Sequence, residues 1–339
     1  MTDPRGEVGN RITGRELREV ISRYDVGRMT AAREFIGGDP NSPKALIDCG
    51  AGRLLLKRRA AGRDDPHRVS FAQSVMIASA EAGVPVPKLY ATMYGGETLL
   101  EHEGHVYELF QFIEGTPYRA SPREAKDAGG VLAKLHAAID GLQTDLVPNA
   151  GAARRRIDLP KFIQKLEQHG EGVDAHVQAS LARMQADWNR AGRELDPLYT
   201  PDPDCDELIH GDYHPGNLIF RFGFVAAVLD FDSARPAPPN VEVAPARLHL
   251  ARVRRGDDPG AWPIAPSHTL LESAWSGYSE HAQEPVEPEL VPWLMVESIV
   301  EETVLSIGSG APVGVVNYAA RVASWVCEHA GGIVSVLGR

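Results

Sequence analysis

The chain has 339 residues, 43% of them hydrophobic and 24% charged, which is the composition of an ordinary globular protein. The 35 Lys and Arg side chains are outnumbered by 46 Asp and Glu, and the net charge is −11. This balance argues against nucleic acid or an anionic membrane as partner, because both require a basic face. A chain of this length exceeds the usual span of one hydrophobic core, so two packed lobes are expected.

No targeting or membrane segment is expected. The first ten residues contain no apolar run, and no stretch approaches the ~20 apolar residues of a membrane helix. The cysteines, Cys49, Cys205 and Cys327, are odd in number and widely spaced, which favours reduced thiols over disulfides or a metal site. We therefore expect a cytoplasmic protein.

The first third of the chain has the pattern of a small antiparallel sheet with two helices. Thr13 and Glu16 form a capping box, which predicts a short N-terminal helix. Apolar runs separated by turn compositions predict strands, and a helical run that stops at Gly83 predicts a second helix. The expected strands are 29–36, 44–48, 53–57, 98–101 and 106–111, and the second helix is expected at 67–81.

Helical periodicity dominates from residue 121 onward. Ser121, Pro122 and Glu124 form a capping box with proline at the first helical position, which predicts a helix to Ile139. Further helices are expected at 159–168, 174–195, 269–281, 290–306 and 316–328 and in the region after Glu242, with short strands at 208–210, 218–221 and 224–229. Strands gathered early and helices gathered late indicate an α+β fold.

Two segments carry recognisable chemistry: HGDYHPGN at 210–217 and LDFD at 229–232. Phosphoryl transfer requires a carboxylate that orients the acceptor hydroxyl, a divalent cation, and a further positive charge on the nucleotide phosphates. Asp212 sits at a strand-to-loop turn and can accept a hydroxyl proton, and Asn217 follows on the same loop. Asp230 ends the next pair of strands, so a hairpin can return it to Asn217. Oxygen ligands of this kind suit Mg²⁺.

These segments resemble those of the aminoglycoside phosphotransferase and choline kinase-like superfamily, whose members are relatives of the protein kinases. The first also matches the protein-kinase catalytic loop, with Gly211 in place of the usual basic residue. The resemblance implies ATP- and Mg²⁺-dependent transfer of the γ-phosphoryl group to a hydroxyl of a small molecule, such as an aminoglycoside-, choline- or homoserine-like acceptor. Asp212 would be the catalytic base, and Asn217 and Asp230 would hold the metal. His210 would brace the loop.

The resemblance also implies a protein-kinase-like bilobal fold of the α+β class. Residues 1–112 would form a nucleotide-binding lobe around the small sheet, together with the N-terminal helix. Residues 113–339 would form a larger, mainly helical lobe that carries catalysis and the acceptor. The chain passes from Asp232 through a short proline-rich stretch into helix, so no long activation segment is expected. A metabolite or drug is therefore favoured over a protein as acceptor.

Further positions would contact the nucleotide. By resemblance, Lys57 would pair with the α and β phosphates, whereas the adjacent Arg58 and Arg59 are expected to be solvated. A glycine-bearing turn with Gly37, Gly38 and Ser42 would cover the phosphates. The linker between the lobes would hold adenine through backbone groups near Gln111 and Ile113. The turn is also compatible with an ordinary hairpin, and the linker with an ordinary last strand.

One position departs from the family pattern. The helix glutamate that usually pairs with the strand lysine is replaced by Gln73, which can hydrogen-bond Lys57 but carries no charge. This favours the alternative of a non-catalytic, pseudokinase-type nucleotide-binding or scaffold protein. The intact Lys57, Asp212, Asn217 and Asp230 favour an enzyme. A hydrolase built on paired carboxylates has no support, because two acids flanking a sugar site are missing.

Several polar residues are compatible with more than one role. Asp232 suits a second magnesium contact or a loop anchor, and His214 and His136 suit structural hydrogen bonds. Carboxylates on the helices would suit an amine-bearing acceptor: Glu242, Glu297, Glu301 and Glu302. The sequence identifies neither the acceptor nor the oligomeric state.

Overall fold

The computed structural model describes residues 11–142, 144, 157–169, 173–198, 207–253, 256, 258–283, 286–308 and 310–337. Cys205 and the proline-rich segment at 199–206 lie outside these ranges. Cys49 and Cys327 are free thiols, as the cysteine spacing predicts.

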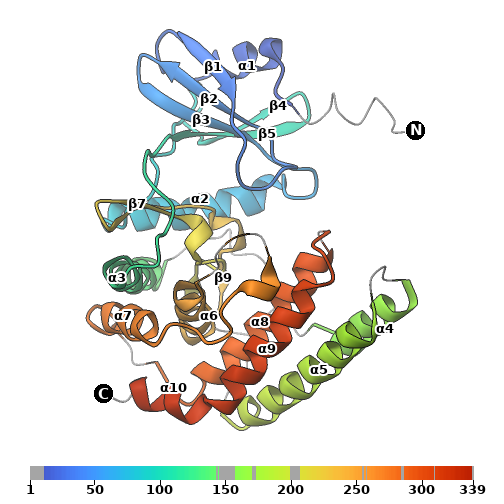
Figure 1. Ribbon diagram of the computed structural model, residues 1–339. Coiled ribbons are helices and arrows are strands. Elements are labelled where there is room, and N and C mark those ends of the chain that lie inside the picture. The colour runs from blue at the N-terminus through green and yellow to red at the C-terminus, as the bar shows by residue number, and fades with distance from the viewer. Residues whose placement is uncertain are drawn as a thin grey trace.

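An antiparallel sheet of five strands forms the top of the molecule in Figure 1, in the order β1-β2-β3-β5-β4. Its strands are β1 (Ala31–Glu34), β2 (Lys44–Cys49), β3 (Gly52–Arg58), β4 (Leu99–His102) and β5 (His105–Gln111). Helix α1 (Gly14–Ile21) begins with the expected capping box of Thr13 and Glu16. Its Val20 packs with Ile47 of β2 and Leu54 of β3 in a core that belongs to the sheet.

Helix α2 (Pro66–Glu81) lies below the sheet and leads into the helical part of the molecule (Figure 1). The Asp65 carboxylate caps its N-terminus, and Pro66 occupies the first helical position. Phe71 and Val75 of this helix belong to the large core of the helical part rather than to the core of the sheet. The helix therefore ties the two parts together.

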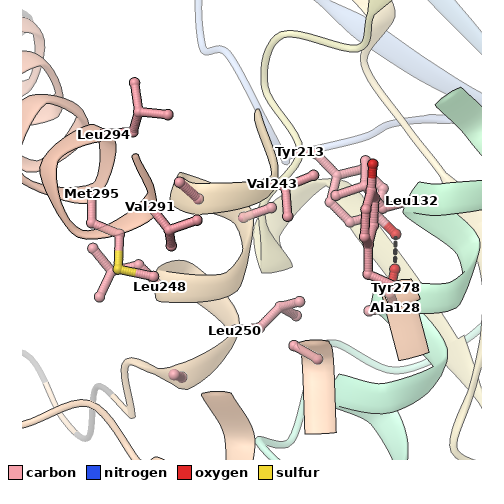
Figure 2. Close-up of a cluster of buried hydrophobic side chains, with 14 of the residues drawn as sticks. Ala128, Leu132, Tyr213, Val243, Leu248, Leu250, Tyr278, Val291, Leu294 and Met295 are labelled. Atoms are coloured by element: carbon pink, nitrogen blue, oxygen red, sulfur yellow. Dashed lines mark hydrogen bonds between the residues drawn. The ribbon is translucent and has the colours of Figure 1, made fainter. Parts of the chain in front are cut away.

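The other helices surround that large core. A slice of it is shown in Figure 2, where the Tyr213 hydroxyl donates to the Ala128 carbonyl at 2.8 Å. The helices are α3 (Pro122–Ile139), α4 (Leu159–His169), α5 (Ala175–Leu195), α6 (Asn240–Ala251), α7 (His268–Ser279), α8 (Val291–Gly308), α9 (Val315–Glu328) and α10 (Ala330–Leu337). Helices α4 and α5 share a second, smaller core with α8 and α9.

Two short strand pairs bring the HGDYHPGN and LDFD segments together. The pairs are β6 (Leu208–Ile209) with β9 (Arg235–Pro236), and β7 (Leu218–Arg221) with β8 (Phe224–Val228). In the second pair Leu218 lies opposite Val228. The residue before β7 and the residues after β8 are therefore neighbours.

The α+β class and each predicted helix and strand described above are confirmed, with ends that differ by at most a few residues. The two-residue strand β9 and the last helix α10 were not predicted individually. None of the helices in the described part of the chain combines the length and apolar character needed to cross a bilayer. The division into lobes at 112/113 stays a prediction.

Candidate active site

The loop between β6 and β7 holds its carboxylate in a fixed orientation. The Asn217 side-chain amide donates to the Asp212 carbonyl oxygen at 2.9 Å and to Asp212 Oδ2 at 3.0 Å. The other carboxylate oxygen, Oδ1, lies 3.5 Å from His214 Nε2. Because the amide nitrogen of Asn217 faces Asp212, its amide oxygen is the atom that can face a cation.

His210 and Glu242 brace this loop from inside. His210 is fully buried, accepts the Asp212 backbone N–H at Nδ1 (3.2 Å) and bonds through Nε2 to the Leu229 carbonyl oxygen (3.0 Å). This confirms the bracing role expected of His210. The Glu242 carboxylate accepts the backbone N–H groups of His210 at 3.0 Å and Gly211 at 2.5 Å. Glu242 is thus a structural anchor of the loop, and the expectation that it contacts the acceptor is not supported by these bonds.

Gly211 is required by its surroundings. Its φ is +82°, in the left-handed region that favours glycine, and a Cβ there would overlap the carbonyl oxygen of Ser233. The basic residue of the protein-kinase loop therefore cannot occupy this position.

The β7–β8 hairpin returns Asp230 to the loop, as its spacing in the sequence predicts. The Leu229 N–H donates to the Asn217 carbonyl at 2.8 Å. Asp230 has φ +62°, an unfavourable conformation for a residue other than glycine. Its Oδ1 lies 3.7 Å from the Lys57 ammonium nitrogen.

Lys57 reaches the same place from β3, with 14% of its side chain exposed, and Asp232 Oδ2 is its nearest carboxylate oxygen at 3.2 Å. Arg59 also binds Asp232, at 2.5 Å, and only 5% of its side chain is exposed. Arg58 is buried as well and pairs with Glu16 at 2.8 Å. The expectation that Arg58 and Arg59 are solvated is wrong, because both arginines are buried and form ion pairs with carboxylates.

The charges around the loop shift its pKa values in different directions. Burial opposes ionisation of Asp212, but His214, His210 and Asn217 together hold the pKa of Asp212 below its usual range. Burial and the nearby Asp232 and Asp212 raise the pKa of Asp230, against the opposing charge of Lys57. Two acids on neighbouring segments, Asp212 before β7 and Asp230 after β8, therefore have pKa values shifted in opposite directions.

The glycine-bearing turn between β1 and β2 is held by a lysine that the sequence did not single out. Ser42 donates from its hydroxyl to Asp39, and Gly38 has φ +67°. Lys44 Nζ donates to the carbonyl oxygens of Asp39 at 3.1 Å and Ser42 at 2.9 Å. In the sheet Lys44 lies directly opposite Lys57, so the turn with Gly37 and Gly38 stands beside the lysine expected to bind phosphate.

In the linker after β5, fewer backbone N–H groups are available to bind a base than the sequence indicates. The Gln111 N–H already donates to the Lys88 carbonyl oxygen at 2.8 Å, and the Phe112 N–H donates to the Arg53 carbonyl oxygen at 3.0 Å. A base edge at this position would therefore meet the Gln111 carbonyl and the Ile113 N–H.

Gln73 has partners other than the lysine that it was expected to bond. Its side-chain nitrogen donates to Glu108 Oε1 at 2.8 Å, and its oxygen accepts from the Thr98 hydroxyl at 2.6 Å. The glutamine is 5% exposed. Glu108 on β5 therefore supplies the acidic group in this part of the structure.

A cleft of about 850 Å³ opens at Asp212. Its lining includes Asp230 and Asp232 and three glutamates of α8, which are Glu297, Glu301 and Glu302. Arg63, Arg68 and Arg235 also line it. The helix glutamates are thus in the same cleft as the catalytic-loop carboxylate.

The donor set fits a nucleotide–Mg²⁺ complex. The side chains of Asn217 and Asp230 offer oxygen ligands from adjacent backbone segments, which is the ligand type that Mg²⁺ prefers. Lys57 supplies the cation that nucleotide phosphates need. Burial, together with the nearby carboxylates of Asp232 and Asp212, raises the pKa of Asp230, and a divalent cation would favour its ionised form.

Residues 33–278 match the model of the phosphotransferase enzyme family, which is well over half of the chain. The chain belongs to this family. This membership confirms the family resemblance of the HGDYHPGN and LDFD segments.

Several known proteins similar to this family member are small-molecule kinases. A homoserine kinase of Phenylobacterium zucineum is 27% identical over 228 residues, 65% of this chain and 64% of that protein, so the chain spans just under two thirds of that relative's length. Amicoumacin kinase hAmiN in complex with AMP-PNP, Ca²⁺ and Ami has a TM-score of 0.69 at 10% identity, with 94% of this chain and 96% of that chain covered. A microcompartment-associated aminopropanol kinase has a TM-score of 0.68 at 17% identity, with 94% and 97% covered. Because these two structures are less than 25% identical to the chain, their similarity shows the fold alone. It confirms the expected kinase-like fold.

The alternation of side chains along a strand could have indicated that Arg59 faces the cleft. Side chains two residues apart on a strand share a face, so Arg59 must follow Lys57 toward the cleft while Arg58 points to the opposite face. Glu108 lies opposite Lys57 in the β3–β5 register. No pattern in the sequence indicates that pairing.

Proposed function

We propose that the protein is an ATP- and magnesium-dependent phosphotransferase that moves the γ-phosphoryl group of the nucleotide to a hydroxyl of a small molecule. The observation that carries this proposal is the convergence of four groups: Asp212 held by Asn217, with Asp230 and Lys57 against the same loop. Membership of the phosphotransferase enzyme family supports it. A scaffold protein would have no need to keep these four side chains together.

In this proposal Asp212 orients the acceptor hydroxyl and takes its proton as the new phosphorus–oxygen bond forms and the bond from the γ-phosphorus to the leaving ADP breaks. Its lowered pKa keeps it ionised near neutral pH, so it is ready to accept that hydrogen bond. Asn217 fixes the carboxylate, and Glu242 fixes the loop backbone. Lys57 would hold the non-transferred phosphates.

Asn217 and Asp230 are the proposed metal ligands. When bound, magnesium would neutralise the negative charge of the nucleotide phosphates during transfer. The Gln111 carbonyl and the Ile113 N–H are proposed to bind adenine, and the turn with Gly37, Gly38 and Ser42 to cover the phosphates.

The acceptor is proposed to be a small hydroxylated amine. Glu297 and Glu301 contribute carboxylates to the lining of the cleft that also contains Asp212, and carboxylates favour an acceptor with a cationic group. The homoserine kinase relative is compatible with such an acceptor. The proposed compartment is the cytoplasm, where the nucleotide is available.

The test is ADP release from ATP and Mg²⁺ with a panel of hydroxylated acceptors, with and without amines. We expect turnover with an amine-bearing acceptor, and a loss of at least about a thousandfold in Asp212→Asn. The same variant should keep the increase in Tm that ATP and Mg²⁺ give the wild-type protein. Wild-type turnover by Asp212→Asn, or nucleotide binding without ADP release for every acceptor, would refute the proposal.

A further inference from the structure

A chain of buried ion pairs leads from the sheet to the loop that carries Asp230 and Asp232. The Arg59 guanidinium binds Asp232 Oδ2 through NH1 and Glu108 Oε2 through Nε, both at 2.5 Å. Only 5% of the Arg59 side chain and 1% of the Glu108 side chain are exposed. One planar guanidinium therefore holds two carboxylates, one on a strand and one on the loop.

The same Asp232 carboxylate receives the Lys57 ammonium at 3.2 Å. Two cations therefore share one carboxylate, since Arg59 binds the same Oδ2 atom. The Asp232 carboxylate is thus shared by the lysine of β3 and the arginine that follows this strand. Its position determines where the lysine ammonium can lie.

Gln73 closes the network at its other end. It donates to Glu108 Oε1 at 2.8 Å and is itself fixed by Thr98. A neutral side chain suits this position, because a carboxylate here would face that of Glu108 in a buried site. The amide of Gln73 is therefore matched to a strand-borne glutamate.

We propose that Arg59 and Glu108 are positioning residues for the phosphate-binding lysine: their ion pair fixes Asp232, and Asp232 fixes Lys57. The anchor of the lysine thus comes from strand β5 instead of helix α2. This inference rests on the proposed function, since it takes Lys57 as a nucleotide ligand. A lysine side chain has several rotatable bonds, so an ammonium fixed before binding loses less conformational entropy when phosphate arrives.

A matched pair of variants separates positioning from general stability. Arg59→Met removes the link between Glu108 and Asp232, whereas Arg58→Met removes a similarly buried ion pair to Glu16 on the other face of the same strand. Titration of the full-length protein with Mg²⁺·AMP-PNP and with adenosine gives two dissociation constants for each variant. Adenosine has no phosphate, so its affinity does not depend on where Lys57 lies.

We expect Arg59→Met to weaken AMP-PNP binding by about tenfold, the loss of one charge-assisted contact, with adenosine binding unchanged. Arg58→Met should change neither affinity. AMP-PNP binding within twofold of wild type in Arg59→Met, or a parallel loss of adenosine binding, would overturn the inference. Failure of the wild-type protein to bind AMP-PNP would instead overturn the proposed function.

Gln73→Glu provides an independent test, which also stands if Arg59→Met does not fold. It restores a helix glutamate but places a second carboxylate against Glu108. The inference predicts weaker AMP-PNP binding, again with adenosine unaffected. Tighter or unchanged AMP-PNP binding would mean that a side chain on α2 can anchor the lysine, and the inference would be wrong.

Discussion

The carboxylate of Glu242 accepts the backbone N–H of Gly211 at 2.5 Å, although the two residues are 31 positions apart in the chain. The same carboxylate accepts from His210 and bonds His136 Nε2 at 2.9 Å. With 3% exposure it is an internal anchor of the loop at 210–217. Loop position and fold stability therefore depend on one buried charge.

Glu242→Gln should destabilise the protein and slow turnover. Glutamine keeps the shape but has one acceptor oxygen, so one of the two loop N–H groups would face an NH₂ group. A buried donor without a partner costs about 2 kcal/mol, which urea unfolding can measure. The control is Glu280→Gln, at a surface ion pair with Lys126, which should leave stability nearly unchanged. Equal effects of the two substitutions would contradict the anchoring role.

The same residue should make stability depend on pH. Burial opposes ionisation of Glu242, but the hydrogen bond from His136 and neighbouring positive charge keep its pKa below the ordinary value of 4.5. The unfolded chain therefore takes up a proton at a higher pH than the folded one. The stabilisation from Glu242 is complete above pH 4.5 and is lost as the pH falls through the lower, folded-state pKa.

The difference in unfolding free energy between wild type and Glu242→Gln should consequently shrink on acidification. Urea titrations at about pH 6 and about pH 4 give the comparison, since the first lies above both pKa values. A difference that stays constant or grows as the pH falls would show that the folded pKa is not lowered.

Lys44→Met should loosen the turn between β1 and β2. The substitution removes the hydrogen bonds from Nζ to the carbonyl oxygens of Asp39 and Ser42. Hydrogen exchange of the amides at 37–44 should become faster, and the increase in Tm given by ATP and Mg²⁺ should fall. Lys126→Met, which removes an exposed lysine paired with Glu280, should change neither measurement. If hydrogen exchange at 37–44 did not change, the turn would keep its conformation without the Lys44 hydrogen bonds, and the prediction would be wrong.

How far the sequence determines this site depends on the separation of the residues involved. Asp212 and Asn217 are five residues apart on one loop, and a strand pair of predictable length returns Asp230 to it, so their meeting could be predicted. The pairing of Arg59 with Glu108 spans 49 residues and that of Lys57 with Asp232 spans 175. Such partners are set by sheet register and by how the loops pack.

Gln73 illustrates the same limit in another way. The helix was predicted from the sequence, and Gln73 was recognised as an uncharged replacement for the usual glutamate. Its partner depends on which strand carries the compensating acid, and Glu108 is at that place only because β5 lies between β3 and β4. A tertiary arrangement, not a local pattern, decides the role of the side chain.

The crossing of α3 and α7 gives a prediction about the fold itself. A Cβ at Gly277 would overlap the carbonyl oxygen of Lys126 on the facing helix, and backbone on both sides leaves no flexible side chain to move away. Gly277→Ala should therefore cost at least about 3 kcal/mol, the upper part of the range for overpacking.

Gly192 in α5 is the matched control for this glycine, because a Cβ there meets no atom of the described chain within 4 Å. Gly192→Ala should stabilise by about 0.5–1 kcal/mol, since alanine loses less conformational freedom in a helix. Thermal unfolding of both variants distinguishes close packing from helix propensity: opposite signs are expected. A rise in Tm for Gly277→Ala would mean that the two helices can separate without loss, and the tight crossing would not be a determinant of stability.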